Sequence, residues 1–339
     1  MIREAIAAVV EGRDLTEVEA SAVMTEIMEG EATPSQIAAF LTGLRLKGET
    51  TDEICGMVRT MRAKAVRVPV DGDLLDIVST GGGAFDPVNI STAAALVCAG
   101  AGVRVAKHGN RGFTSASGAA DVLEALGAKL ELTPEQAALC LSETGFAFLF
   151  AQAFHPAMRH AGPTRREIGI RTIFNSLGPL TNPAGANRQL LGAGDSRLAP
   201  RIAEVAARLG TVRTLVVHAE DGLDEVSLGA VTSVLDVQGA AVTAYTWTAA
   251  DAGLPPRPVG EVKTGTATEN AERIRLVLAG KDGADRDYVL VNAAAGLVAA
   301  GRVATLGEGV KVAEQSISSG AAAEVLRKYV DLTRKLGGS

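Results

Sequence analysis

Two glycine-rich segments carry the residue types best suited to chemistry. The segment at 79–83 reads STGGG, and the segment at 107–112 reads KHGNRG. Glycine lets backbone N–H groups approach an anion without interference from a Cβ atom. Lys107 and Arg111 add full positive charges beside the second segment. Two such segments predict one ligand with at least two anionic groups, of which a phosphorylated sugar or nucleotide is the simplest. The alternative interpretation is that these glycines serve only tight turns.

Acidic residues form a second candidate centre in the segment EDGLDEV at 220–226. The segment follows an apolar run at 214–218 that predicts a strand, so it should form a loop at the end of that strand. Adjacent carboxylates in such a loop suit a hard divalent cation. They would fit a solvated turn equally well, and both interpretations stay open on these residues alone.

Arginines mark a third candidate centre, because Arg165, Arg166 and Arg171 all lie in the polar segment 161–187, which we expect to be rich in loops. Most arginines make ion pairs at the surface. An arginine close to a strand end and an anion site is also a good carboxylate receptor, since its guanidinium can bind both oxygens at once.

The elements that must position these residues follow a strand–loop–helix order. Apolar runs at 74–78 and 103–106 come before the two glycine-rich segments, and helix-forming runs at 89–99 and 117–126 come after them. A further buried strand is expected at 146–150. This order predicts a parallel sheet flanked by helices, with ligands at the carboxyl ends of the strands. Each glycine-rich segment would then open onto a helix N-terminus, which favours anions.

Residues 1–70 predict a separate helical domain. Apolar residues recur there at spacings of three and four, and Thr33 and Thr51 stand where helices should start. Residues 71–339 should form the second domain, in which short antiparallel strands at 226–247 and four closing helices follow the parallel part. The expected fold class is α/β, with a small N-terminal all-helical domain plus a large domain with a mostly parallel central sheet flanked by helices.

Composition narrows the class of protein. The net charge of −6 and the pI of about 5.4 argue against a nucleic-acid partner, and aromatic residues at 4% offer few surfaces for base stacking. Cys55, Cys98 and Cys140 lack the spacing of a zinc site or a disulfide framework. No apolar run reaches the length of a membrane span, and no signal peptide is expected at the N-terminus. We therefore expect a cytoplasmic protein that binds neither membranes nor nucleic acid.

The run KHGNRGFTSASGAADVLEALG, which starts at Lys107, closely resembles the signature of the anthranilate phosphoribosyltransferase family. STGGG, five further residues and NIST resemble that family's GTGGD-x5-NIST loop at equal spacing. HPAMRHAGPTRREIGIRTIFNSLGPLTNPAG is similar to another segment of the family, and the resemblance covers nearly the whole chain. It implies transfer of the phosphoribosyl group of phosphoribosyl pyrophosphate to the amine of anthranilate. The products would be N-(5-phosphoribosyl)anthranilate and pyrophosphate, in tryptophan biosynthesis.

The resemblance also implies residues for the first substrate and its metal. Phosphoribosyl pyrophosphate would be held by the two glycine-rich segments and the helix start after the first one, through Ser79, Gly81, Gly82, Gly83, Asn89, Ile90, Ser91, Thr92, Lys107, Gly109, Asn110, Arg111 and Ser115. Magnesium, as two ions brought in with this substrate, would be held by Ser91, Asp224 and Glu225. The ions and the loop amides would neutralise the departing pyrophosphate.

Anthranilate would contact Arg165, Asn110, His108 and His155, with Arg165 holding its carboxylate. An aromatic amine is unprotonated near neutral pH, so no residue is expected to act as a general acid or base. The resemblance further implies a homodimer through the helical domain, which part of 160–185 is expected to join. The expected partners are therefore the two small-molecule substrates and a second copy of the chain.

Three positions depart from the family pattern. Gly83 stands where the family has aspartate, Ser79 where it has glycine, and Ala119 where it has a serine that contacts phosphate. The loss of a carboxylate beside the pyrophosphate predicts a changed magnesium dependence with activity retained.

Two rival functions remain at this stage. A pyrimidine nucleoside phosphorylase shares the architecture and needs an anion loop, but it would leave Arg165 and Asn110 without a carboxylate to bind. A non-catalytic relative of the fold that binds nucleic acid would fit the changed loop residues, although the acidic pI argues against it.

Overall fold

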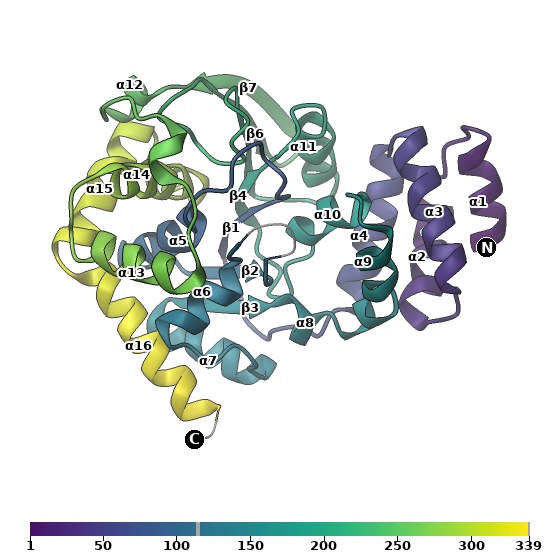
Figure 1. Cartoon of the computed structure of the whole chain (residues 1–339), viewed down its shortest axis with the longest axis horizontal. Helices are drawn as coiled ribbons and strands as arrows, with labels where there is room; N and C mark the ends of the chain where they lie inside the picture. The colour runs from purple at the N-terminus through teal and green to yellow at the C-terminus, as the bar shows by residue number, and fades with distance from the viewer. Residues whose placement is uncertain (113–115, 338–339) are drawn as a thin grey trace.

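The structure, a computed structural model, describes residues 1–112 and 116–337 of the chain. The expected contact of Ser115 with phosphoribosyl pyrophosphate therefore lies outside the described residues. The chain begins with a helical bundle, which Figure 1 shows in purple to one side of the sheet. Its helices are α1 (Ile2–Val10), α2 (Glu17–Glu29), α3 (Pro34–Lys47) and α4 (Thr51–Lys64).

Threonines start three of these helices. Thr16, Thr33 and Thr50 each accept the backbone N–H of the residue three positions on, whose Glu or Gln side chain accepts the threonine N–H in return. The cap expected at Thr51 is therefore wrong by one residue, because it is Thr50 that has a glutamate, Glu53, three residues later.

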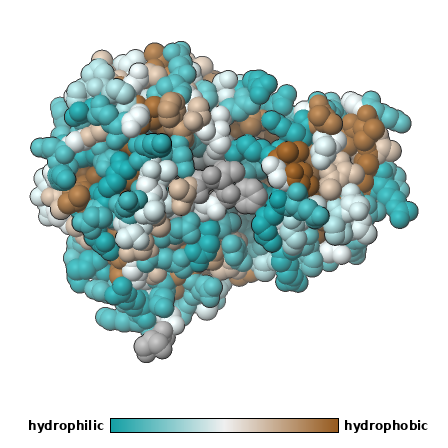
Figure 2. Space-filling view, in the orientation of Figure 1, coloured by the Kyte–Doolittle hydropathy of each residue, from teal (hydrophilic) through white to brown (hydrophobic). Residues whose placement is uncertain are grey.

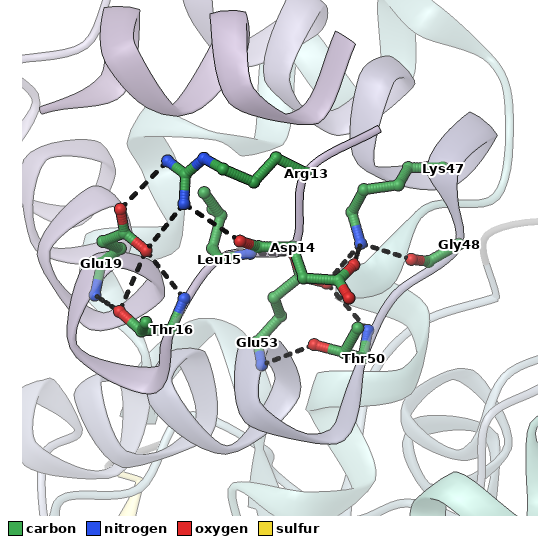
Figure 3. A network of polar contacts seen from close by, with 9 residues as sticks. All are labelled: Arg13, Asp14, Leu15, Thr16, Glu19, Lys47, Gly48, Thr50 and Glu53. Atoms are coloured by element: carbon green, nitrogen blue, oxygen red, sulfur yellow. Dashed lines mark hydrogen bonds and ion pairs between the residues drawn. The ribbon is translucent and has the colours of Figure 1, made fainter. Parts of the chain in front are cut away.

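A buried ion pair joins the loops of this bundle (Figure 3). Lys47, at the end of α3, donates to Glu53, to Asp14 and to a backbone carbonyl. Glu53 also accepts the backbone N–H groups of Leu15 and Thr50. Both carboxylate oxygens of Glu53 and all three donors of Lys47 thus have partners inside the bundle. Because buried charges are tolerated only when paired and hydrogen-bonded, this network fixes the α1–α2 connection against α3 and α4.

The second part of the chain is built on a seven-stranded sheet in the described residues, with the order β3-β2-β1-β4-β5-β6-β7. Its strands are β1 (Leu75–Ser79), β2 (Val105–Gly109), β3 (Phe146–Phe150), β4 (Arg188–Gly192), β5 (Arg213–Ala219), β6 (Thr232–Gln238) and β7 (Ala241–Trp247). The first five strands are parallel, and β6 and β7 are antiparallel. The chain runs outward from β1 to β3 and returns on the other side of β1 with β4. β1 and β4 therefore flank a topological switch point, where the loops after the strands diverge and ligands bind.

Helices cover both faces of this sheet (Figure 1). They are α5 (Ile90–Gly100), α6 (Ala119–Leu126), α7 (Pro134–Thr144), α8 (Ala151–Phe154), α11 (Ala199–Arg208), α12 (Ala249–Ala252), α13 (Ala267–Leu278), α14 (Ala284–Ala299), α15 (Leu306–Ser318) and α16 (Ala321–Leu336). Successive strand residues face opposite ways. Leu190 packs into a core with α5 and α14, whereas Leu191 packs into a second core with α11 and the N-terminal helices.

The segment 161–187 is more helical than the sequence predicts. It contains α9 (Gly162–Ile168) and α10 (Ile173–Leu177), so the expectation of a loop-rich segment is wrong for these stretches. Pro163 lies in the first turn of α9, where no intrahelical N–H bond is lost, and Gly169 ends that helix with φ of +69°. Helices this short leave too little periodicity to be read from a sequence.

The second core continues from the N-terminal helices into α9 and α10. Ile173, Phe174 and Leu177 are buried in it together with residues such as Phe40 of α3. In Figure 1 the same segment lies between the purple bundle and the sheet. Among the described residues, no helix combines the length and the apolar character needed to cross a membrane.

Candidate active site

The first glycine-rich segment leaves the carboxyl end of β1 beside the switch point. Gly81 and Gly82 have φ of +65° and +77°, a left-handed conformation that glycine adopts without strain. Thr80 fixes the base of the segment, because its N–H donates to the carbonyl of Gly192 in β4 and its hydroxyl accepts the N–H of Gly194. The loop backbone therefore follows a path set by the neighbouring strand.

Asn89 connects the start of α5 to the residues before α6 and to α13. Its side-chain NH₂ donates to the carbonyl of Ser117, and its oxygen accepts a hydrogen bond from Asn270. α5 begins at the next residue, and Thr92 in its first turn is buried with a hydroxyl that has no partner among the described residues. The N-terminus of α5, together with Ile90, is thus held against the residues that lead into α6, and its free N–H groups can face an anion.

Lys107 is buried inside the site instead of standing beside its loop. It lies on β2, and its ammonium donates to the carbonyl of Ile77 in β1 and to the hydroxyl of Ser91 in α5. Burial lowers its pKa, while the charges of Asp76 and Glu225 oppose this shift. Its charge therefore serves the interior of the site, next to Ser91 and Glu225.

Asp76 is a site residue that the sequence analysis missed. It is fully buried in β1, where it accepts the N–H of His108 and the side-chain NH₂ of Asn182. Burial raises its pKa to about 6, and the nearby charge of Lys107 opposes the shift. The signal was the single carboxylate in the apolar run LLDIV, since a charged residue inside a buried strand needs a partner.

Asp224 and Glu225 lie in the loop after β5 and face the same interior. The Oε2 atom of Glu225 is buried and has no hydrogen-bond partner in the described part of the chain. Burial, followed by the charge of Asp224, raises the pKa of Glu225 to about 8, and burial also raises the pKa of Asp224. With Ser91, the two acids line a cavity of about 10 Å³, space for roughly one water or small ion.

A divalent cation fits this donor set. Two buried carboxylates beside each other disfavour ionisation, and a cation between them would remove that cost. No cluster of three or more His, Cys, Asp or Glu side chains suited to a metal ion occurs in residues 1–112 and 116–337. The protein alone therefore supplies a partial ligand set of the kind magnesium uses when substrate phosphates complete its shell.

Two of the departures from the family pattern lie close to Asp224. A Cβ atom on Gly83 would lie 2.7 Å from the carbonyl oxygen of Gly222 and 3.1 Å from the Asp224 carboxylate, so a side chain there requires the backbone to move. Ser79 accepts the N–H of Gly81 and lines the same small cavity as Asp224. Ala119, the third departure, is the first residue of α6.

The rest of the second segment faces outward. Arg111 pairs with Asp121 and Glu124 of α6 and lies 5.5 Å from the ring centre of Phe150. Asn110 is exposed, and its side-chain oxygen accepts the N–H of Arg111. Gly109 ends β2 just before it. The guanidinium of Arg111 is thus bound to α6 and does not join the buried cluster around Lys107.

Arg165 lies on α9 with its guanidinium over the ring of Phe174 in α10, 4.9 Å from the ring centre. Burial lowers its pKa to about 10, and no acidic group among the described residues opposes this shift. A guanidinium supported by an aromatic ring and without an acidic partner is ready to bind the carboxylate of a ligand. Arg166, by contrast, is exposed.

His108 and His155 form a buried pair with ring centres 5.1 Å apart. One nitrogen of each ring contacts a backbone carbonyl, that of Gly178 or Thr181, and the other nitrogen has no partner among the described residues. Burial lowers the pKa of His108 to about 3 and that of His155 to about 4. Both rings are therefore neutral at neutral pH, which suits lining residues and not proton carriers.

The two parts of the chain match two models of one family. Residues 3–65 match the helical bundle domain of the glycosyl transferase family, and residues 71–323 match its a/b domain. The anthranilate phosphoribosyltransferase of Symbiobacterium thermophilum is 52% identical over 329 residues, which cover 97% of this chain and 96% of that relative. The chain belongs to the anthranilate phosphoribosyltransferase family.

Solved structures of anthranilate phosphoribosyltransferases share the fold. The enzyme from Thermus thermophilus is 46% identical, with a TM-score of 0.91 over 97% of this chain and 99% of that chain. The enzyme from Saccharomyces cerevisiae, in complex with phosphoribosyl pyrophosphate and magnesium, is 28% identical, with a TM-score of 0.92 over 99% of this chain and 98% of that chain. The expected fold class and family are thereby confirmed.

Proposed function

We propose that this chain transfers the phosphoribosyl group of phosphoribosyl pyrophosphate to the amine of anthranilate, in tryptophan biosynthesis. The products are N-(5-phosphoribosyl)anthranilate and pyrophosphate. This proposal is supported by two ionisable groups in the site that lack partners in the described part of the chain: the buried Oε2 of Glu225 has no hydrogen bond, and the guanidinium of Arg165 has no acidic partner. The first suits the metal-bound diphosphate, and the second suits the carboxylate of the acceptor.

The leaving-group side uses the loop backbone and one buried cation. The N–H of Gly82 and the N–H groups at the start of α5 bind the diphosphate oxygens, and Gly81 lets the loop backbone turn toward them. The ammonium of Lys107, which donates to Ser91, adds a positive charge beside them. Ser91, Asp224 and Glu225 hold magnesium, which we propose to be two ions. Magnesium supplies positive charge that stabilises the departing diphosphate. The other proposed contacts of this substrate are Ser79, Gly83, Asn89, Ile90, Thr92, Gly109, Asn110 and Arg111.

The acceptor side needs orientation and no base. Arg165 binds the carboxylate of anthranilate, Asn110 orients the molecule, and the neutral rings of His108 and His155 line its site. Because an aromatic amine already carries a free electron pair near neutral pH, correct placement at the ribose carbon is what accelerates the reaction. The partnerless guanidinium favours this acceptor over a pyrimidine nucleoside, which has no carboxylate.

The proposed assembly is a homodimer through residues 1–70 and part of 160–185. Large apolar side chains are exposed on the helical bundle: Met1, Val10, Val18 and Leu46. Figure 2 shows brown, apolar surface on this bundle, at the right of the view. Packing of Ile173 and Phe174 into the core of the bundle supports the assignment of α10 to this unit. We propose a cytoplasmic location, since all three cysteines are free thiols.

A fluorescence assay tests the proposed reaction. Anthranilate should lose its fluorescence when phosphoribosyl pyrophosphate and magnesium are both present, and should keep it when either is omitted. Arg165→Ala should raise the KM for anthranilate far more than Arg166→Ala, its exposed neighbour. Unchanged fluorescence, combined with phosphorolysis of a pyrimidine nucleoside, would replace the proposal with the rival function.

A further inference from the structure

Arg171 connects the loop that receives the diphosphate to the stretch that receives the acceptor. It lies between α9 and α10, the helices that carry Arg165 and Phe174. Its Nη2 atom donates to the carbonyls of Thr80 and Gly81, at 2.8 and 2.7 Å. Two binding elements that are about ninety positions apart in the chain are thus joined by one guanidinium.

The backbone around Arg171 is fixed on both sides. Gly169 ends α9 in a left-handed conformation, and the N–H of Thr172 donates to the side chain of Asn175 as α10 begins. Gly178, a contact of His108, follows directly after α10. A shift of the acceptor-binding stretch is therefore transmitted to Arg171.

The contact with the loop is close-packed as well as hydrogen-bonded. A Cβ atom on Gly82 would lie 2.1 Å from Nη1 and 2.3 Å from Cζ of Arg171, so the guanidinium lies directly against the glycine. Gly82 thus has two reasons to lack a side chain, its positive φ and the presence of Arg171.

The hydrogen bonds to Arg171 also decide which side of the loop presents its N–H groups. The peptide bonds are trans, so the N–H of each peptide unit points away from its carbonyl. Arg171 holds the carbonyls of the units that contain the N–H groups of Gly81 and Gly82. The N–H of Gly81 donates to Ser79, which lines the small cavity of Asp224 and Glu225. The carbonyl side therefore faces Arg171, and the N–H side faces the acidic pair that would hold magnesium.

The charge of Arg171 is not used in an ion pair within 4 Å in the described part of the chain, although Asp224 and Asp195 act on it from farther away. It lines a cavity of about 300 Å³ together with Arg45 of α3 and His218 of β5. Arg45 lines the same cavity as a second arginine, and none of its hydrogen bonds reaches the loop among the described residues. It is therefore a matched control for the loss of charge alone.

We infer that Arg171 is a positioning residue that couples the binding of the two substrates. Arg171 ties the acceptor-binding stretch to the carbonyl side of the diphosphate loop. A ligand bound at either of these two places therefore also orders the other place. This inference rests on the proposed function, because it assigns the diphosphate to the loop and the acceptor to Arg165. Coupling of this kind is reciprocal, so each ligand changes the affinity of the other by the same factor.

Calorimetry with magnesium pyrophosphate, in the presence and absence of saturating anthranilate, measures this factor. The wild-type protein should bind pyrophosphate at least about 5-fold more tightly when anthranilate is present. Arg171→Ala should bind it more weakly and bring the factor close to one, whereas Arg45→Ala should retain the wild-type factor. Arg171→Lys should resemble Arg171→Ala, because an ammonium keeps the charge but loses the planar packing over Gly82.

A wild-type factor of one, an unchanged factor in the Arg171 variants, or an equal loss in Arg45→Ala would each overturn the inference. If Arg171→Ala does not fold, Arg171→Lys decides the outcome.

Hydrogen exchange of the ligand-free protein gives a readout that does not depend on turnover. Exchange at Gly81 and Gly82 should be faster in Arg171→Lys than in Arg45→Ala, and equal exchange would contradict the tether. Absence of anthranilate turnover by the wild-type protein would instead count against the proposed function.

Discussion

Each part of the molecule buries a lysine and a glutamate whose charges act on each other, and the two sets differ in how completely their polar groups are satisfied. In the helical bundle, Lys47 and Glu53 find all of their hydrogen-bond partners within the bundle. Beside the sheet, Lys107 donates to one carbonyl and one hydroxyl, and among the described residues it forms no ion pair within 4 Å with Glu225. Glu225 keeps a buried oxygen that has no hydrogen-bond partner in the same part of the chain. Burying a charge costs free energy in both places. Only for Lys47 and Glu53 do hydrogen bonds and ion pairs within the described chain offset that cost.

This difference separates a structural pair from a functional one. Burial of charge is common to both, so burial alone identifies neither. What identifies the site is the missing partner, because a group that stays unsatisfied in the protein gains most from a ligand. The expected pattern is that damage to the bundle pair lowers stability, whereas damage to the sheet pair lowers activity.

The largest effect is expected from Glu53→Ala, which should lower the free energy of unfolding by roughly 3–5 kcal/mol, since Lys47 then loses its buried carboxylate. Urea unfolding measures this loss. Glu19→Ala is the control, because Glu19 belongs to the neighbouring exposed contacts in Figure 3 and should cost much less. Equal losses in the two variants would contradict the structural role of the Lys47–Glu53 pair.

Glu225→Gln should lower the activity and leave the stability intact, the opposite of what is expected for Glu53→Ala. Its kcat/KM for phosphoribosyl pyrophosphate should fall by about 10²–10³, the usual range for loss of one electrostatic group in a site. Its free energy of unfolding should stay the same or rise, because an amide avoids the cost of burying the Glu225 carboxyl, whose pKa is raised to about 8. Glu220→Gln, in the same loop and exposed, should change neither quantity. A Glu225→Gln variant that is unstable but active would reverse the comparison.

The buried histidines give a pH-dependent stability. Their pKa values in the folded state lie near 3 and 4, below the ordinary value, so the unfolded chain binds more protons as the pH falls. These histidines cost no stability above about pH 6.5, and the loss of stability grows as the pH falls toward 4. For His155 the loss at pH 5 is on the order of 2 kcal/mol. Urea unfolding at pH 7 and pH 5 measures it, and His155→Gln should reduce the difference. Identical stability of the wild-type protein at both pH values would refute it.

The smallest effect concerns the departure at Gly83. We expect Gly83→Asp to shift the magnesium concentration for half-maximal rate, because it adds a carboxylate beside Asp224. Gly83→Ala separates this charge from the displacement of the backbone that any Cβ atom causes. A shift of roughly tenfold or less between the two variants corresponds to a single partly solvated charge. Superimposable titrations of Gly83→Asp, Gly83→Ala and the wild-type protein would end the idea.

Local sequence pattern was sufficient to predict many of the helices and strands. The strand–loop–helix order around 74–126 has clear periodicity, and it placed the first glycine-rich segment correctly at the end of β1. The expectation that the second segment begins after a strand at 103–106 was wrong by three residues, because 107–109 still belong to β2. For the adjacent acids Asp224 and Glu225, local pattern fitted a solvated turn equally well, and only the family resemblance singled them out as magnesium ligands. Arg165 was identified through its family segment, and its packing on Phe174 gives the physical reason for its position.

Tertiary contacts decided what the sequence could not show. β4 is a central strand, but its apolar run is short and follows a segment of turns, so no strand was predicted there. The inward direction of Lys107 depends on β1 and α5 beside it. The pairing of Arg111 with α6 and the contact of Arg171 with the first loop join residues whose proximity no spacing reveals.

The core that α1 to α4 share with later segments has a consequence for synthesis of the chain. Its members include Phe174 of α10, Leu191 of β4 and Ala206 of α11, which follow the bundle by more than a hundred positions. Until these residues have left the ribosome, the apolar surfaces that they cover stay open to solvent and to other nascent chains. The first helices to be synthesised are thus among the last to have their apolar surfaces covered. These surfaces stay exposed until translation has passed α11.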